Sequence, residues 1–259
     1  MNPPFLVVLV GLLVGALIGL TGLGGGVVLL PLLILGLDVV PLVAVGSGVV
    51  FSALTKVGAA GLHWRRGNVD GRLAAAMALG SVPGALAGVK LLASLRSRYG
   101  EGVNEILTTL IGLLLIVIPL LLLFQKRLEE RGGPRLRDLL PGWIHPYHGA
   151  VATGLIGGIL VGATSVGSGS VIMILLLLFY RRRPSVLVGT DIFHAVILTG
   201  VAGLAHLSLG TVDFRLVGWL VVGSVPGVLL ASWVVNLLPA VWLRRVLIVL
   251  LIATGVKMV

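Results

Sequence analysis

The chain has 259 residues, of which 58% are hydrophobic and 11% are charged, and it contains no cysteine. A water-soluble domain carries about 25% charged residues, because its surface faces water. The composition therefore excludes an ordinary soluble domain, and the missing cysteines exclude disulfides, cysteine nucleophiles and thiolate-bound metals. We predict an all-α polytopic membrane protein, because about 20 apolar residues are enough for one membrane crossing.

The formal net charge is +10, but the basic residues do not form a continuous stretch. They occur in small groups between apolar runs, for example at Arg65-Arg66 and Arg181–Arg183. Such groups are typical of the loops that orient membrane helices. We therefore expect the lipid bilayer and no nucleic acid as partner, a place in the bacterial cytoplasmic (inner) membrane, and no cleaved signal peptide. A homodimer is one assembly that the sequence leaves open.

Apolar segments follow one another along the whole chain. They run over Pro3–Leu37, Val39–Leu62, Leu73–Leu95, Val103–Phe124, Tyr147–Tyr180, Ser185–His206, Leu216–Val235 and Val241–Val256. The long polar stretch lies in the middle, so we predict an N-terminal repeat over 1–124, a polar linker loop over 125–146, and a C-terminal repeat over 147–259.

The two halves are copies of one design. A shift of 143 residues aligns them without a gap from Gly19 to Gly84, and Gly80–Gly84 recurs as Gly223–Gly227 with the same five letters, Gly-Ser-Val-Pro-Gly. Other matched residues are Thr21 with Thr164, Pro41 with Pro184, His63 with His206, and Asp70 with Asp213. This register indicates an internal duplication, which is common among transporters.

The first segment of each repeat is too long for one straight crossing. Each has about 34 residues, which as a helix would span about 50 Å against a hydrocarbon core of about 30 Å. Glycines interrupt both segments, at Thr21–Gly26 and Thr164–Gly169. Each is therefore either a long tilted crossing or a re-entrant hairpin. Lysine and arginine divide nearly evenly between the two faces in the first case and unevenly in the second. We therefore favour two inverted repeats, each with a broken, re-entrant first helix plus three spans.

The two glycine-rich breaks are the predicted substrate site. Irregular backbone at membrane depth persists only where protein buries it or where it lines a wet cavity, and free N–H groups at a helix start bind anions. The predicted substrate-binding residues are Thr21, Gly22, Gly24, Gly25, Gly26, Ser47, Ser52, Lys56, Thr164, Ser165, Gly167, Ser168, Gly169, Ser170 and Thr190. The alternative is that the glycines only allow close helix packing. Neither break carries the Lys-Ser/Thr ending of a nucleotide-binding loop.

Lys56, Asp191 and His194 are ionisable residues inside the predicted spans. A charge in hydrocarbon costs about 2.5–3.5 kcal/mol on insertion scales, so such residues face a pathway or a partner. Asp191 and His194 share one helical face and form a predicted proton-coupling pair. Lys56 either neutralises an anionic substrate or forms a structural ion pair with Asp191.

The other polar residues at matched positions have structural explanations. We expect His63 and His206 at the membrane interface, Asp70 and Asp213 as helix caps, and Gly80–Gly84 and Gly223–Gly227 as kinks at helix contacts. No metal-ligating or catalytic motif occurs, so we predict no enzyme activity, no metal and no cofactor.

The quoted motifs resemble those of the TauE/SafE family, also called sulfite exporters or 4-toluene sulfonate uptake permeases. The resemblance rests on the break followed by Val27–Pro31, on Ala44–Ser47 and on Gly67–Asp70, all repeated in the second half, and it covers nearly the whole chain. It implies a secondary transporter of sulfite, sulfonates or related anions. The chain departs from the pattern where Ser165 and Ser168 replace glycines, which predicts an asymmetric site.

From the residues and this resemblance we predict a secondary active transporter of a small anion, a sulfur oxyanion or an organosulfonate. Its site would lie between the two broken helices, with alternating access and coupling to protons. The alternative is an anion or solute channel without countermovement. A membrane-embedded enzyme or scaffold ranks last, because no catalytic constellation supports it.

Overall fold

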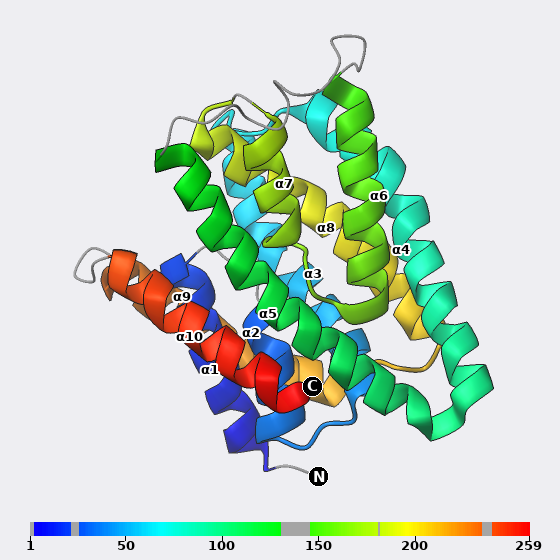
Figure 1. The fold of residues 1–259 in the computed structure, drawn as a ribbon. Coiled ribbons are helices and arrows are strands. Elements are labelled where there is room, and N and C mark those ends of the chain that lie inside the picture. Colours follow the sequence, from blue (N-terminus) through cyan, green and yellow to red (C-terminus); the bar gives the residue numbers. More distant parts are fainter. Residues whose placement is uncertain (1–2, 22–25, 131–145, 181, 235–239) are drawn as a thin grey trace.

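The structure, a computed structural model, describes residues 3–21, 26–130, 146–180, 182–234 and 240–259 (Figure 1), and within these residues it is helical with no strand. The N-terminal half holds α1 (Pro4–Thr21), α2 (Gly26–Pro31), the π-helical turn η1 (Leu32–Gly36), α3 (Pro41–Arg65), α4 (Gly71–Tyr99), the 3₁₀ turn η2 (Gly100–Gly102) and α5 (Val103–Glu130). The C-terminal half holds α6 (Pro146–Thr164), α7 (Val171–Phe179), α8 (Pro184–Ser208), α9 (Phe214–Val234) and α10 (Ala240–Met258).

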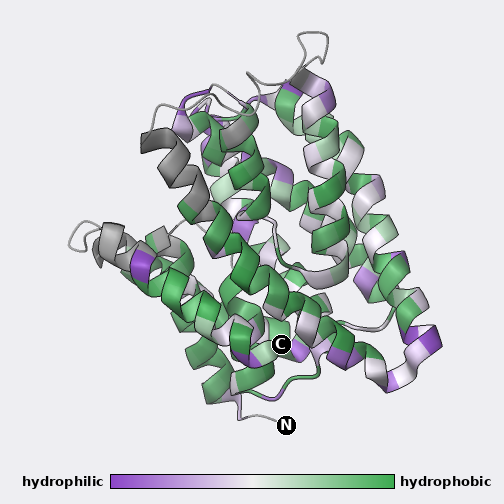
Figure 2. Cartoon of the chain, viewed as in Figure 1, coloured by the Kyte–Doolittle hydropathy of each residue, from purple (hydrophilic) through white to green (hydrophobic). Residues whose placement is uncertain are grey.

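The helices have the length and composition of membrane spans. Within the described residues, five stretches are long and apolar enough to cross a bilayer: Pro41–Arg65, Gly71–Leu121, Tyr147–Thr164, Pro184–Ser208 and Phe214–Ala231. Large apolar side chains such as Leu79 and Leu204 are mostly exposed on the outside. Figure 2 shows apolar colour along most of the helices. The prediction of an all-α protein with several candidate membrane spans is therefore confirmed for the described residues.

Helix α5 extends into the segment that we assigned to the linker. It continues to Glu130 and therefore includes Gln125–Glu130. Helix propagation explains this extension, because Gln, Lys, Arg, Leu and Glu are all good helix formers and polar composition alone does not stop a helix. The rest of the predicted linker, 131–145, lies outside the described residues, and α6 begins at Pro146.

The two halves pack crosswise. The most extensive helix pairs are α4 with α6 and α1 with α9, followed by α3 with α8. Under the shift of 143 residues, α1 corresponds to α6 and α4 to α9, so the first two pairs are equivalent to each other. Each half thus completes its packing only with helices of the other half.

Glycines make both of these cross-repeat contacts. On α4, a Cβ at Gly84 would lie 2.5 Å from the carbonyl oxygen of Leu155 on α6. At the equivalent place, Gly227 of α9 faces Leu12 of α1 in the same way. Only glycine allows two helix backbones to approach this closely. The prediction that these motifs lie at helix contacts is therefore confirmed, and both helices continue through their internal prolines, Pro83 and Pro226.

The equivalent helices α3 and α8 run antiparallel. Gly203 near the end of α8 packs against Val49 and Val50 in the first half of α3. Gly189 near the start of α8 packs against Asn68, which follows the end of α3. The starts of these two equivalent helices therefore lie at opposite ends of the molecule, as Figure 1 shows.

Helices α6 and α7 form a hairpin. A Cβ at Gly157, halfway along α6, would touch the Ile172 side chain at the start of α7. A Cβ at Gly149, near the start of α6, would lie 3.5 Å from the hydroxyl of Tyr180, directly after α7. The chain therefore leaves this unit at the end where it entered, and the break between the two helices is the tip of the hairpin (Figure 1).

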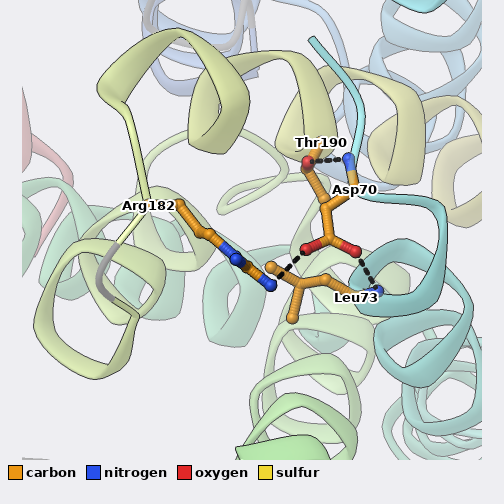
Figure 3. A network of polar contacts seen from close by, with 4 residues as sticks. All are labelled: Asp70, Leu73, Arg182 and Thr190. Carbon is orange, nitrogen blue, oxygen red and sulfur yellow. Dashed lines mark hydrogen bonds and ion pairs between the residues drawn. The ribbon is translucent and has the colours of Figure 1, made fainter. Parts of the chain in front are cut away.

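Two buried hydroxyls form hydrogen bonds between the two halves. Thr190 on α8 accepts a hydrogen bond from the backbone N–H of Asp70 at 2.9 Å, and Ser47 on α3 accepts one from the N–H of Asp213 at 3.0 Å. These two contacts are equivalent under the repeat register. Asp70 in turn accepts from the N–H of Leu73 at the start of α4, as Figure 3 shows. Asp213 does the same for Leu216 at the start of α9, so the predicted helix caps are confirmed.

The glycine contacts predict a position-specific effect on stability. Gly223→Ala on α9 places a Cβ against the Val8 carbonyl oxygen of α1, whereas Gly218→Ala on the same helix meets open space. We expect Gly223→Ala to lower the free energy of unfolding by about 1–3 kcal/mol, because overpacking forces backbone shifts. Gly218→Ala should be neutral or slightly stabilising, because alanine favours helix. Thermal unfolding in detergent measures both, and equal midpoints would contradict the packing described here.

The hydrogen bond from the Asp70 N–H to the Thr190 hydroxyl gives a second stability prediction. Thr190→Val keeps the shape of the side chain but leaves the Asp70 N–H without its acceptor. We expect a loss of about 1–3 kcal/mol, the cost of a polar group left unpaired in a buried place. Thr190→Ser is the matched control, because it keeps the hydroxyl that the equivalent Ser47 supplies in the other half. A higher thermal unfolding midpoint for Thr190→Val than for Thr190→Ser would contradict this role.

Candidate anion-binding site

The tip of the α6–α7 hairpin is a buried stretch of irregular backbone, Ser165–Ser170. Ser165 has a φ of 60° and Gly167 a φ of 116°, so the chain turns through conformations that glycine adopts freely and serine rarely does. Thr164 stabilises the turn, because its Oγ1 accepts a hydrogen bond from the Val166 N–H at 3.2 Å. A second turn bond runs from the Gly169 N–H to the Gly167 carbonyl.

The second break lies against the start of α2. A Cβ at Gly26, the first residue of α2, would lie 2.5 Å from the Ser165 carbonyl oxygen. A Cβ at Gly48 on α3 would lie 3.1 Å from the Ser165 hydroxyl. The structure thus brings Gly26 and the predicted residues of the second break together. Thr21 ends α1, while Gly22, Gly24 and Gly25 lie outside the described residues.

Lys56 reaches the second break from α3. Its ammonium donates hydrogen bonds to the carbonyl oxygen of Ser168 and, at 2.9 Å, to the Ser168 hydroxyl. The hydroxyl of Ser52, one turn earlier on α3, lies 3.5 Å from the same Ser168 hydroxyl. Three of the predicted substrate-binding side chains therefore meet at one point, although Ser168 lies more than 100 residues further along the chain.

Several donors at this tip have no partner. The hydroxyls of Ser165 and Ser170 are fully buried and make no hydrogen bond in the part of the chain that the structure describes. Helix α7 starts at the same tip, and its N-cap, Ser170, makes no side-chain capping bond. A buried polar group without a partner costs about 1–3 kcal/mol, so a ligand that accepts hydrogen bonds is stabilised here. Together with Lys56, these donors favour an anion.

Asp191 and His194 lie on α8 and are both buried. Among the described residues, one carboxylate oxygen of Asp191, Oδ1, has no hydrogen-bond partner. His194 Nε2 lies 2.7 Å from the hydroxyl of Ser81 on α4, and its Nδ1 has no partner in the same part of the chain. Lys56 and Asp191 are close enough to interact electrostatically, but Lys56 directs its hydrogen bonds to Ser168. The contacts therefore do not favour the alternative in which Lys56 and Asp191 form a closed structural ion pair.

The expected interfacial position of His206 is wrong. This side chain is fully buried, and its two ring nitrogens lie 2.9 Å from the Thr211 hydroxyl and from the Gly162 carbonyl oxygen. Its position at the end of an apolar run suggested the membrane interface, but the crosswise packing covers that end with α6. His206 thus binds the last turn of α6 at Gly162, which lies two residues before Thr164 and the break. The matched His63 is half-buried, with an unpaired Nδ1.

Two of the predicted substrate-binding residues make structural contacts between the repeats, and two residues near the site were not predicted from the sequence. Ser47 and Thr190 fasten the two halves, as described above, and their role in substrate binding stays a prediction. Ser81 and His206 were not among the predicted site residues. Ser81 lies in the repeated Gly-Ser-Val-Pro-Gly motif and contacts His194, so this motif was the signal that could have identified it.

Comparison with known proteins identifies relatives over the full chain. The family model described as sulfite exporter TauE/SafE matches residues 7–258. A "Probable membrane transporter protein YjnA" of Bacillus subtilis (strain 168) is 33% identical over 253 residues, covering 98% of both chains. A "Probable membrane transporter protein YdhB" of the same organism is 28% identical, covering 92% of this chain and 93% of that relative. No solved structure matches.

The family model and the similarity to YjnA both extend over almost every segment discussed above, including both breaks, α3 and α8. The resemblance inferred from the repeated motifs is thereby confirmed. The chain belongs to the TauE/SafE family of membrane transporters.

Proposed function

We propose that this protein is a secondary active transporter of a small anion, a sulfur oxyanion or an organosulfonate, that binds at the tip of the α6–α7 hairpin. The observation that carries the proposal is that the Lys56 ammonium binds Ser168 in the same buried break that holds the hydroxyls of Ser165 and Ser170, which have no partner among the described residues. Oxyanions accept several hydrogen bonds at once, which suits a cluster of donors around one cation. The family description, sulfite exporter, supports a sulfur oxyanion.

We further propose that the two repeats have inverted topology and that their first helices are re-entrant. The antiparallel course of the equivalent α3 and α8 supports the inversion, and the hairpin of α6 and α7 supports re-entry. In inverted-repeat transporters the site lies near the bilayer midplane, and movement of one part against another opens it to each side in turn. Relatives from Bacillus subtilis support placement in a cytoplasmic membrane.

The first functional test removes the positive charge of the Lys56 side chain. Lys56→Gln should reduce saturable counterflow of labelled sulfite in proteoliposomes by about 10- to 100-fold, because a hydrogen bond to a charged group contributes about 1.5–3 kcal/mol. Lys90→Gln is the matched control, since Lys90 is an exposed lysine on α4. The same assay with thiosulfate, sulfate and an alkyl sulfonate ranks the substrates. Unchanged counterflow in Lys56→Gln would overturn the assignment of the site.

Counterflow also separates the carrier from the channel. A carrier exchanges labelled for unlabelled substrate and saturates, because each cycle returns through one binding site. A channel gives flux that rises linearly with concentration and shows no acceleration by substrate on the opposite side. The buried position of Ser165–Ser170 between α6 and α7 supports the carrier.

We also propose that transport is coupled to protons through Asp191 and His194. Both are buried beside the site, and each has an unpaired polar atom that can hold or release a proton. A site that already contains Lys56 and Asp191 becomes negative when a monoanion enters, and a proton on Asp191 restores neutrality. Uptake of a charge into a buried site is costly, which gives the coupling its physical reason.

This coupling predicts a specific defect in Asp191→Asn. The variant should lose the acceleration of flux by a pH gradient but retain counterflow at equal pH, because an amide stays neutral while it occupies the same volume. Asp38→Asn, at an exposed carboxylate between η1 and α3, is the control and should keep the acceleration. Fluorescent pH reporting inside proteoliposomes measures proton movement directly. If Asp191→Asn responds to the gradient as the unchanged protein does, the coupling role is excluded.

A further inference from the structure

The two equivalent helix starts, at Asp70 and at Asp213, differ in what covers them. Both aspartates cap a helix, and both N–H groups are held by a hydroxyl of the other repeat. The antiparallel course of α3 and α8 places these two starts toward opposite ends of the molecule. Any difference between them is therefore a difference between the two sides from which a central site can be reached.

At the Asp70 end, an arginine forms an ion pair with the aspartate. Arg182, in the connection between α7 and α8, contacts the second carboxylate oxygen of Asp70, with Nη2 3.1 Å from Oδ2 (Figure 3). The Arg182 side chain is 56% exposed and that of Asp70 19%, so the pair lies at the rim. Asp70 thus uses three groups for three elements: its N–H for α8, Oδ1 for α4 and Oδ2 for the α7–α8 connection.

At the Asp213 end, the surface is hollow. The residue equivalent to Arg182 is Val39, which has no charge to offer to Asp213. A cavity of about 360 Å³ lies there, and Val39, Asp213, Arg215, Leu216 and Trp219 are among its lining residues. Its lining includes the charged residues Asp213 and Arg215, and it is large enough for a small hydrated anion, which Arg215 would attract from solution.

We propose that the cavity at Asp213 is the access vestibule of the anion path on one face, and that the Arg182–Asp70 ion pair locks the equivalent vestibule on the other face. The inference rests on the proposed alternating access. Because Val39 cannot form the matching ion pair, the described residues hold no equivalent of this lock at the Asp213 end. The protein therefore rests with the Asp213 end open, and the Asp70 end opens only when the ion pair breaks.

The absence of cysteine from the chain makes a direct test simple. Leu216 lines the open cavity and is 8% exposed, and its equivalent beside Asp70, Leu73, is 2% exposed. Single variants Leu216→Cys and Leu73→Cys are reacted with N-ethylmaleimide in membranes, and the labelling rates are compared. We expect Leu216→Cys to react faster. Ala76→Cys, equivalent to the cavity residue Trp219, serves as a second reporter if Leu73→Cys is unstable.

Breaking the lock should then expose the closed end. Adding Arg182→Gln or Asp70→Asn should raise the labelling rate of Leu73→Cys about two- to fivefold, because ion pairs at a rim shift an equilibrium modestly. Asparagine still caps a helix, so Asp70→Asn removes the charge and keeps the cap. Combining both changes should add nothing further. Arg183→Gln, at the neighbouring exposed arginine, is the control and should leave the rate unchanged.

Two results would overturn the inference. One is equal labelling of Leu73→Cys and Leu216→Cys in the chain with its ion pair intact. The other is an effect of Arg183→Gln as large as that of Arg182→Gln, which would indicate a general loosening of the α7–α8 connection. Labelling needs no substrate, so it is independent of the counterflow assay. A failed anion assay with the expected labelling would reject the proposed function alone.

Discussion

The close approach of helices across the repeat boundary determines everything else in this structure. Glycines on α4 meet α6, and the equivalent glycines on α9 meet α1, with backbone against backbone. Because each contact joins one repeat to the other, neither half can bury its own helices alone. The same crosswise arrangement brings α3 beside α8 and places Lys56 of the first half against Ser168 of the second. The candidate site is thus a product of the packing between repeats and belongs to neither one.

That packing also explains how irregular backbone can exist deep inside an apolar protein. The hydroxyls of Ser165 and Ser170, which have no partner among the described residues, would be costly against lipid, where nothing can bond to them. Here the tip of the hairpin is enclosed by α2 and α3, and Lys56 satisfies the Ser168 carbonyl. His206 fixes the preceding turn through the Gly162 carbonyl. The donors that remain free at Ser165 and Ser170 are the part of the hairpin that the protein itself leaves unsatisfied.

The sequence predicted the helical class, the duplication, the breaks and the two aspartate caps, because each of these depends on local pattern. It could not predict contacts between residues far apart in the chain. Thr190 and Ser47 illustrate the limit: matched hydroxyls in apolar spans suggest a ligand, but only the structure shows that they accept the N–H groups of Asp70 and Asp213. His206 shows the same limit. The end of an apolar run faces the membrane interface only if no neighbouring helix covers it, and here α6 does.

The two repeats have equivalent helices, but they differ in their charged residues. Lys56 corresponds to Thr199, Asp191 to Gly48, and Arg182 to Val39, so each ionisable group that matters here has an uncharged equivalent. Glycines and hydroxyls that support the fold are kept in both halves, because both interfaces need the same geometry. A symmetric scaffold would have the same energy when open to either side. Under the alternating access that we propose, a cation, a carboxylate and a rim ion pair placed in single copy would remove that equality and would give the two faces different barriers.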